Sequence, residues 1–437
     1  MPKQLSGTGV LFTDRRNLYL SPSVTKELWT SVAPFITVAS NRNFLTGLQD
    51  PLFKQFEHRD NWRVQKFLVN EATPATIPSD NTESTAIVVD GIVGLASSVD
   101  ASYLGLVVEI WNSTETTKRG VAVITSAPSS TTIKFKSLET SGSIAPADND
   151  VIHVIGHVAG EGASSPEAWA DELRTVWGST QIFRTPVEVT GTLLAAALRG
   201  YSKEFERLQM QKMKEHKMLK ERDSLFGMSP IGTNLDVDVA ETFTDSTGSG
   251  AAWRTDASGN KLRTTMGIIT AIEKYGKTSG DSQNIFTITE GSYKYANFVD
   301  DMEKVFQYYP EDGFKYAFSG PGAISYWSKL DNNVITKSGF KVQVGPETPD
   351  PLGFNVRNLE TPHGLIKLVL TPALRGPRNK YMLVVSQENL SMVQYRPMEY
   401  RTNIKTDNAP DLQKDEIFSD EGVGMTLIES HSLFKIV

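Results

Sequence analysis

Residues 192–226 form the longest proline-free run of strong helix formers, and this run limits the possible folds more than any other segment. Apolar residues recur there at helical steps of three and four, at Leu194, Leu198, Tyr201, Phe205 and Leu208. Gly227 stands where a C-terminal cap belongs. The pattern predicts a single helix of roughly 50 Å. Because its apolar stripe is narrow and its charge density high, we expect this helix to lie across a surface.

The charges of this helix are unequal. It carries eight basic and five acidic residues, although the whole chain has a formal charge of −7. A local basic excess favours contact with a polyanion such as DNA. The candidate DNA-facing residues are Lys212, Lys214, Lys217 and Lys220. A solvated helix face with no partner explains the same charges equally well, so both interpretations stay open.

Residues 85–158 have a different character, rich in valine, isoleucine, threonine and serine. Short runs typical of strands recur between turn residues, at the spacing of a small antiparallel barrel or sandwich. These runs are 85–89, 104–111, 120–125, 130–136 and 150–156. We interpret the segment as an inserted β-domain, and the alternative is a continuation of one larger sheet.

The remaining segments mix both kinds of element. Residues 1–50 are punctuated by prolines and are typical of an extended arm, with one short helix expected at Val24–Ala33. A strand is expected at Trp62–Val69. Further helices are predicted at Leu262–Tyr275, Tyr293–Tyr309 and Pro321–Leu330, and strands at Phe340–Val344, Leu365–Leu370, Tyr381–Ser386 and Ser391–Arg396.

The composition excludes several classes of protein. The chain has no cysteine, so disulfides and thiolate chemistry are absent. We find no signal-peptide core and no apolar run approaching the roughly 18 residues of a membrane span, so we expect a cytosolic product. The acidic balance argues against a regulator or polymerase that grips DNA over its whole surface, but a container that encloses DNA need not be basic.

Three patterns suggest a nucleotide-binding or metal-binding site, but the geometry of each one does not fit such a site. Residues 271–278 resemble a phosphate-binding loop, but the helix precedes the glycine instead of following it. His153 and His157 lie in a predicted strand, where four residues span about 13 Å, too far to share one metal ion. Asp236, Asp238 and Glu241 lack the glycine that a calcium loop requires. We therefore predict no catalytic, metal or cofactor site, although a carboxylate pair could hide among the 51 acidic residues.

Four further segments occur in a specific order over nearly the whole chain: 161–162, 180–192, 222–227 with 263–268, and 411–421 with 426–431. Together they resemble the major capsid proteins of tailed bacteriophages with the HK ninety-seven-like fold, in the branch that carries a β-rich insertion in its extended loop. The segment between Glu421 and Thr426 and the region around Phe56–Phe67 match this pattern only in outline.

The resemblance implies an α+β capsid fold with an inserted small β-barrel or sandwich. The implied parts are an N-terminal arm (1–51), an extended loop (52–84 and 159–190), an inserted β-domain (85–158), a spine helix with the first part of the peripheral domain (191–260), an axial domain (261–377) and the second part of the peripheral domain (378–437).

The resemblance also implies a function and partners. The chain is expected to be a structural shell subunit and not an enzyme, assembling in the bacterial cytoplasm into hexamers and pentamers around double-stranded DNA. Expected partners are other copies of the chain, a portal protein, and optionally scaffold, protease and decoration proteins, with no membrane and no cofactor. The alternatives are an encapsulin-like compartment, a phage tail or decoration protein, and an enzyme with carboxylate chemistry.

Overall fold

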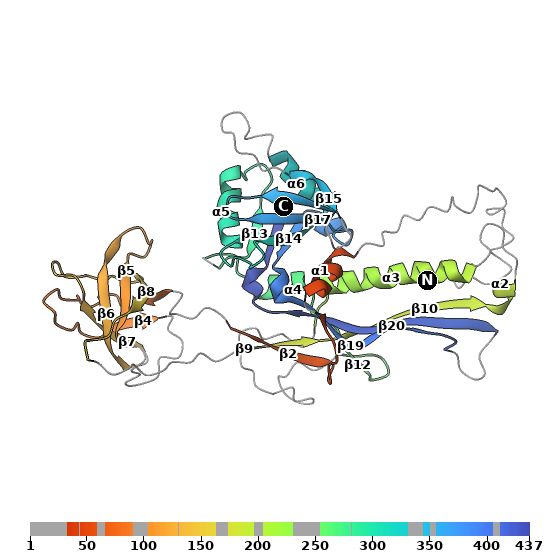
Figure 1. Ribbon diagram of the computed structural model, residues 1–437, viewed down its shortest axis with the longest axis horizontal. Helices are drawn as coiled ribbons and strands as arrows, with labels where there is room; N and C mark the ends of the chain where they lie inside the picture. The colour runs from red at the N-terminus through yellow and green to blue at the C-terminus, as the bar shows by residue number, and fades with distance from the viewer. Residues whose placement is uncertain are drawn as a thin grey trace. The chain divides into compact units, whose positions relative to one another are not determined.

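The structure, a computed structural model, describes residues 33–42, 44–58, 66–90, 104–129, 131–162, 174–195, 204–229, 254–280, 282–330, 344–349, 355–404 and 411–437. It divides into two compact units (Figure 1). Unit 1 combines Met1–Glu57 with Thr175–Val437, and unit 2 is His58–Arg174. The chain therefore leaves unit 1 once and returns to it.

Unit 2 contains a closed barrel in which the strands follow the order β3-β4-β7-β6-β5-β8. Buried and half-buried residues alternate along β5 and β7, as expected for strands with one face toward a barrel interior. Phe67, Ile110 and Phe135 are among the fully buried side chains of this core. The strands are β3 (Lys66–Val69), β4 (Ile87–Asp90), β5 (Leu106–Trp111), β6 (Lys118–Ser129), β7 (Thr132–Ser137) and β8 (Val151–His157).

The barrel begins earlier in the chain than the β-domain expected from residue 85. Strand β3, which we had assigned to the extended loop, pairs with both β4 and β8 and so closes the barrel. Buried and half-buried residues alternate over only four residues of β3. Residues 62–65 of the strand predicted at Trp62–Val69 lie outside the described residues. The division of the chain into capsid domains stays a prediction.

Unit 1 contains a four-stranded sheet in the order β1-β19-β20-β10. Strand β10 alternates buried with exposed residues, so only one of its faces is covered. Helix α3 (Glu204–Phe226) lies along the covered face (Figure 1). The other elements of this layer are α1 (Pro34–Arg42), β1 (Phe44–Leu45), β10 (Gln181–Thr190), α2 (Gly191–Ala195), β19 (Leu390–Arg401) and β20 (Leu412–Met425).

A second, seven-stranded sheet of unit 1 has the order β13-β21-β18-β14-β17-β16-β15. Trp327 is fully buried beside it, with its ring centroid 5.2 Å from that of Phe298 and 5.9 Å from that of Phe434. The strands are β13 (Ile285–Ile288), β14 (Phe314–Ser319), β15 (Val344–Pro349), β16 (Asn355–Glu360), β17 (Leu365–Leu370), β18 (Tyr381–Val385) and β21 (Ser432–Ile436), and the helices are α4 (Ile268–Tyr275), α5 (Tyr295–Val305) and α6 (Pro321–Leu330).

Two short ladders complete unit 1. Strands β2 (Leu52–Glu57) and β9 (Arg174–Ser179) pair with each other at the point where the chain leaves for unit 2 and returns. Strands β11 (Arg254–Thr255) and β12 (Lys261–Leu262) form a hairpin.

The structure tests only some of the predicted elements. The expected helix at 192–226 is described as α2 and α3, and residues 196–203 between them lie outside the described residues. The helix expected from Leu262 begins at Ile268, because Leu262 belongs to β12. The helix expected at Val24–Ala33 and most of the strand expected at Phe340–Val344 also lie outside the described residues, whereas α6 and β17 have the predicted bounds.

The C-terminal segment contributes to both sheets of unit 1. Strands β18 and β21 belong to the seven-stranded sheet, and β19 and β20 belong to the four-stranded one. The expected boundary at 377 between axial and peripheral domains therefore passes through the seven-stranded sheet. Long-range pairings such as β13 with β21 cannot be seen in local periodicity.

Candidate functional site

Helix α3 contacts the four-stranded sheet through a row of polar side chains. Gln209 donates to the Tyr400 hydroxyl, Lys220 pairs with Glu421, and Gln181 donates to the Asp223 carboxylate at 2.8 Å. His216 occupies the same row. The positions 209, 216, 220 and 223 are spaced by seven, four and three, the spacing of residues on one helix face. Directional bonds therefore fix the register of α3 on the sheet.

His216 is the centre of this row and is fully buried. Its Nδ1 lies 3.0 Å from the Thr185 hydroxyl of β10, and its Nε2 lies 3.0 Å from the Ser419 hydroxyl of β20. Burial lowers the pKa of the imidazole to about 4, and the nearby Lys220 ammonium acts in the same direction. The imidazole is therefore neutral at pH 7 and bridges two strands to the helix.

Glu221, on another side of α3, holds helix α1. Its two carboxylate oxygens accept hydrogen bonds from the backbone N–H groups of Phe35 at 2.9 Å and Ile36 at 3.0 Å. These N–H groups belong to the first turn of α1, which has no intrahelical acceptors for them. Burial raises the pKa of Glu221 to about 7, and the two N–H donors oppose that rise. Helix α3 therefore anchors helix α1.

Segments 180–192, 222–227 and 263–268, which carried part of the family resemblance, meet Val423 of β20 at the C-terminal end of α3. The Thr265 backbone N–H donates to Gln181 Oε1 at 3.1 Å, and the Val423 N–H donates to the Thr265 hydroxyl at 3.0 Å. The Gly267 N–H donates to the Gly227 carbonyl at 2.8 Å. A Cβ on Gly267 would lie 2.5 Å from the Gly227 nitrogen, so only glycine fits. Four distant stretches of sequence thus form one junction.

A buried carboxylate lies on the opposite face of the sheet. Asp420 of β20 is fully buried, and its Oδ2 accepts hydrogen bonds from Arg263 at 2.9 Å and Arg396 at 3.0 Å. Arg263 also donates to the Thr180 hydroxyl at 3.2 Å. The carboxylate therefore ties the turn after β12 and strand β19 to strand β20.

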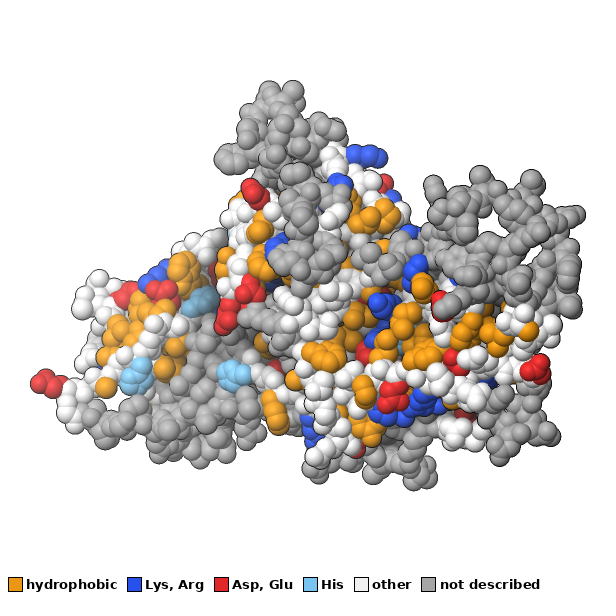
Figure 2. Space-filling view, turned by 45° about the vertical axis from the view of Figure 1, so that its right-hand side comes forward, with side chains coloured by type: hydrophobic (Ala, Val, Ile, Leu, Met, Phe, Trp, Pro, Cys, Tyr) orange, Lys and Arg blue, Asp and Glu red, His pale blue; other side chains and the backbone are white. Residues whose placement is uncertain are grey.

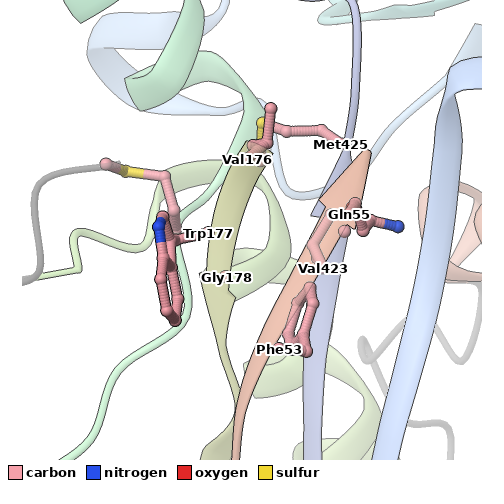
Figure 3. A pocket seen from close by; sticks show the side chains of 9 residues that line it. Phe53, Gln55, Val176, Trp177, Gly178, Val423 and Met425 are labelled. Carbon is pink, nitrogen blue, oxygen red and sulfur yellow. The ribbon is translucent and has the colours of Figure 1, made fainter. Parts of the chain in front are cut away.

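The ladder of β2 and β9 is packed tightly against β20, around a small apolar pocket (Figure 3). Figure 3 shows Phe53 beside Gly178 and Val423, and a Cβ on Gly178 would lie 2.2 Å from the Phe53 ring. Glu57 is buried and accepts a hydrogen bond of 2.8 Å from the Leu427 N–H. The root of the predicted extended loop is therefore fixed to the body of unit 1.

The four predicted DNA-facing lysines of α3 differ in their surroundings. Lys217 is exposed and Lys214 is half-buried. Lys212 forms an ion pair of 2.6 Å with Glu215. Lys220 is 9% exposed and is paired with Glu421, so little of its charge is available to an outside ligand. Figure 2 shows basic and acidic side chains mixed over the described residues of the face in view.

Of the metal patterns considered from the sequence, the structure describes only the pair His153 and His157. His157 Nε2 lies 3.1 Å from the Leu104 carbonyl oxygen, whereas His153 lies 3.8 Å from Glu115. Asp236, Asp238 and Glu241 lie outside the described residues. Within the described residues no group of three or more potential ligands could hold a metal ion. No helix in the same part of the chain is both long and apolar enough to cross a bilayer.

The sequence analysis did not identify most of the residues that define this site, and it named Lys220 only as a DNA-facing residue. Glu221 and Lys220 appear in the sequence as two more charges on a helix, with no sign that both are buried. The polar spacing of Gln209, His216, Lys220 and Asp223 was the available signal. This polar spacing was not recognised as a buried face, because a buried helix face is usually marked by an apolar stripe.

A helix laid across a sheet by polar contacts, with the β2–β9 ladder packed against the same sheet and a second sheet in the same unit, defines a phage capsid-like fold with mixed helices and sheets. Residues 124–413, about two thirds of the chain, match the model of the SU10 major capsid protein family. The chain belongs to the SU10 major capsid protein family, and it is the major capsid protein of a tailed phage.

Solved structures with a similar fold include capsid proteins and an encapsulin. The capsid of Myoviridae phage XM1 is 7% identical, with 98% of this chain and 100% of that chain covered and a TM-score of 0.44. Microbacterium phage Oxtober96 is 9% identical, with 96% of each chain covered and a TM-score of 0.42. The SrpI encapsulin of Synechococcus elongatus is 8% identical, with 61% and 76% covered and a TM-score of 0.38. A search of curated proteins gave no match.

Proposed function

We propose that this major capsid protein assembles in the bacterial cytoplasm into hexamers and pentamers that enclose double-stranded DNA, with an HK ninety-seven-like arrangement of its domains. The observation that carries the proposal is the spine helix α3, which lies on the β10–β20 ladder beside a fixed loop root. Rings of identical subunits use heterologous interfaces, and many weak contacts then sum to a stable shell.

Sedimentation velocity of the full chain tests the assembly. Rings and shells of a 48.2 kDa subunit sediment far ahead of the monomer. If the particles form but enclose a protein cargo in place of DNA, the encapsulin-like alternative replaces the phage head. A chain that stays monomeric at every concentration, with and without a co-expressed scaffold, would contradict the proposal.

The barrel of unit 2 is proposed as an inserted domain that decorates the outer surface or bridges capsomers. Its closed strand order and its own apolar core support independent folding. Replacing residues 66–157 with a short linker should leave the melting temperature of the isolated subunit nearly unchanged and make shells dissociate at lower denaturant concentration. Shells of unchanged stability would rule out the bridging role.

The exposed side of α3 is proposed to face the packaged DNA, and Lys212, Lys214 and Lys217 are its contact residues. Replacing all three with glutamine should shorten the packaged DNA or lower the temperature at which it is released, because phosphate contacts are electrostatic. Lys220→Gln serves as the comparison, since it breaks the buried pair with Glu421 and should lower the stability of the subunit itself. Unchanged DNA length and release temperature in the triple variant would refute the contact.

The remaining partners are proposed from the family alone. They are a portal protein and, optionally, scaffold, protease and decoration proteins, with the arm and loop rearranging as the shell matures. A single shell diameter before and after DNA filling would contradict that rearrangement.

A further inference from the structure

Two arginines from distant parts of the chain meet at the C-terminal end of α3. The guanidinium carbon of Arg378 lies 4.2 Å from the ring centroid of Phe226, the last residue of the helix. Arg222 precedes Phe226 by four residues, so both side chains lie on one helix face. The Phe226 ring packs against the core of unit 1, whereas Arg222 and Arg378 are exposed. We call Arg222 and Arg378 the arginine pair.

The loop that carries Arg378 is held firmly by its next residue, Asn379. The Asn379 side-chain oxygen accepts a hydrogen bond of 3.0 Å from the Gly322 N–H, and its carbonyl accepts one of 3.2 Å from the Ala323 N–H. A Cβ on Gly320 would lie 2.2 Å from the Asn379 carbonyl oxygen, so the loop packs closely on the start of α6. Together with the cation–π contact, this packing leaves Arg378 little rotamer freedom to lose when it binds a ligand.

Helix α4 and the loop bring further cations to this end of α3. The Thr270 hydroxyl donates to the Phe226 carbonyl oxygen at 3.1 Å, which fixes the first turn of α4 against the end of α3. Lys274 follows Thr270 by one helical turn and is exposed. Arg375, also exposed, precedes Arg378 by three residues. Four cations, counting the arginine pair, therefore come from three segments that meet at this junction.

The acidic side chains of these segments do not neutralise the arginine pair. Residues 371–380 contain three basic residues and no acidic one. Glu273 of α4 forms an ion pair of 2.8 Å with Lys435, and half-buried Asp223 of α3 accepts its hydrogen bond from Gln181. Among the described residues, no carboxylate forms an ion pair with either arginine of the pair. The charge of the pair is therefore available to an anionic ligand.

We propose that the arginine pair is a phosphate-binding site for the backbone of the enclosed DNA. The proposal rests on the proposed enclosure of DNA and adds a site outside the three lysines of α3. A guanidinium group binds phosphate through two parallel N–H donors, and stacking on an aromatic ring leaves these donors free at its edge. Interfaces with nucleic acid are much more positively charged than interfaces between proteins, which favours DNA over an acidic protein as the ligand.

Fluorescence anisotropy of a labelled DNA duplex, titrated with dissociated full-length subunits between about 0.05 and 0.2 M salt, tests the site. The Arg222→Gln/Arg378→Gln variant should lower the slope of log Kd against log salt concentration by about two, because each phosphate contact contributes about one. The matched control is Lys329→Gln/Arg357→Gln, which removes the same charge from exposed positions of unit 1 and should leave the slope nearly unchanged. An equal change in both double variants would overturn the proposal.

Two charge-conserving variants test the stacked geometry. Arg378→Lys keeps the cation but loses the planar donor pair, and Phe226→Leu keeps every charge but removes the ring. Each should weaken duplex binding by about threefold, the order of one exposed cation–π contact. Melting temperatures of both variants verify that the subunit stays folded. Duplex affinities equal to that of the unmodified chain in both variants would contradict a site built on this ring.

An acidic polypeptide separates the two possible kinds of ligand. Polyglutamate of the same charge as the duplex should bind more weakly and lose little affinity in the Arg222→Gln/Arg378→Gln variant. If that variant loses polyglutamate binding but keeps duplex binding, the site serves an acidic protein and the proposal fails. Failure of the unmodified chain to form shells would reject the proposed assembly, and it is observed separately from these titrations.

Discussion

The carboxylate of Glu221 accepts a hydrogen bond of 2.9 Å from the backbone N–H of Phe35, a residue 186 positions earlier in the chain. Helix α3 therefore holds the first turn of α1, and Glu221 and Phe35 are both buried. Phe35 in turn packs its ring edge-on against Phe318 of the seven-stranded sheet, with centroids 5.3 Å apart. One carboxylate thus links α3 to α1, whose residues pack with residues of both sheets of unit 1 in one hydrophobic core.

The first prediction concerns the pH dependence of this link. The folded-state pKa of Glu221 is about 7, above the unfolded value of 4.5, so its stabilising effect is complete below pH 4.5 and is lost as pH rises through 7. The expected loss in the free energy of unfolding is roughly 3 kcal/mol, and Glu221→Gln should remove it. Chemical denaturation of dissociated subunits at pH 5 and pH 8 measures it. Glu215→Gln on the same helix is the control, and an equal pH dependence in both variants would contradict the assignment.

The second prediction is that the stabilising effect of His216 changes with pH in the opposite direction to that of Glu221. Its pKa falls from 6.5 in the unfolded chain to about 4 in the fold, so its stabilising effect is present above pH 6.5 and is lost as pH falls toward 4. His216→Gln should reduce the acid destabilisation of the subunit by roughly 3 kcal/mol. His431 is also buried, and burial lowers its pKa to about 3. Its own contribution to acid destabilisation therefore remains in the His216→Gln variant. An unchanged acid profile would show that His216 is not the buried neutral bridge described above.

The third prediction concerns the glycine contact at the junction. Gly267→Ala places a Cβ 2.5 Å from backbone atoms of Phe226 and Gly227, which cannot move like the end of a side chain. We expect a loss of at least about 3 kcal/mol in the free energy of unfolding. Gly156→Ala in the barrel, where a Cβ meets nothing within 4 Å, is the matched control and should change little. Equal melting temperatures for the two variants would disprove the close approach.

The fourth prediction concerns the aromatic core of the seven-stranded sheet. Trp327 is fully buried, and its Nε1–H has no partner among the described residues. Trp327→Ala should cost roughly 3–5 kcal/mol because it leaves a cavity. Trp327→Phe should cost much less, since it keeps ring contacts and removes an unsatisfied donor. Urea denaturation measures the free energy of unfolding of both variants. An equal loss in Trp327→Ala and Trp327→Phe would mean that ring volume is not what stabilises this core.

Much of the local structure could be predicted from sequence because it depends on near neighbours. Pro321 at the start of α6 and the apolar run of β17 gave elements with the observed bounds. Residues 222–227 and 263–268 were identified as family segments, and the structure joins them through Gly227 and Gly267. Local pattern and family resemblance together were enough for the class of protein.

The contacts that hold the site together could not be predicted, because they join distant residues. Lys220 and Glu221 look alike in sequence, yet one pairs with a strand residue two hundred positions later and the other caps a helix near the N-terminus. The approach of Arg184, Arg396 and Arg401 to the Phe418 ring depends on the register of three strands. A shift of one residue would turn Arg184 toward α3. Helix periodicity carries no information about such pairings.

The central claim is that this chain builds a capsid, and negative-stain electron microscopy of the purified, tag-free protein tests it most directly. Expressed alone or together with a scaffold protein, if the phage encodes one, the protein should form hexameric rings, shells or tubes, with pentamers at the points where shells close. Strictly monodisperse monomers under all of these conditions would contradict the account.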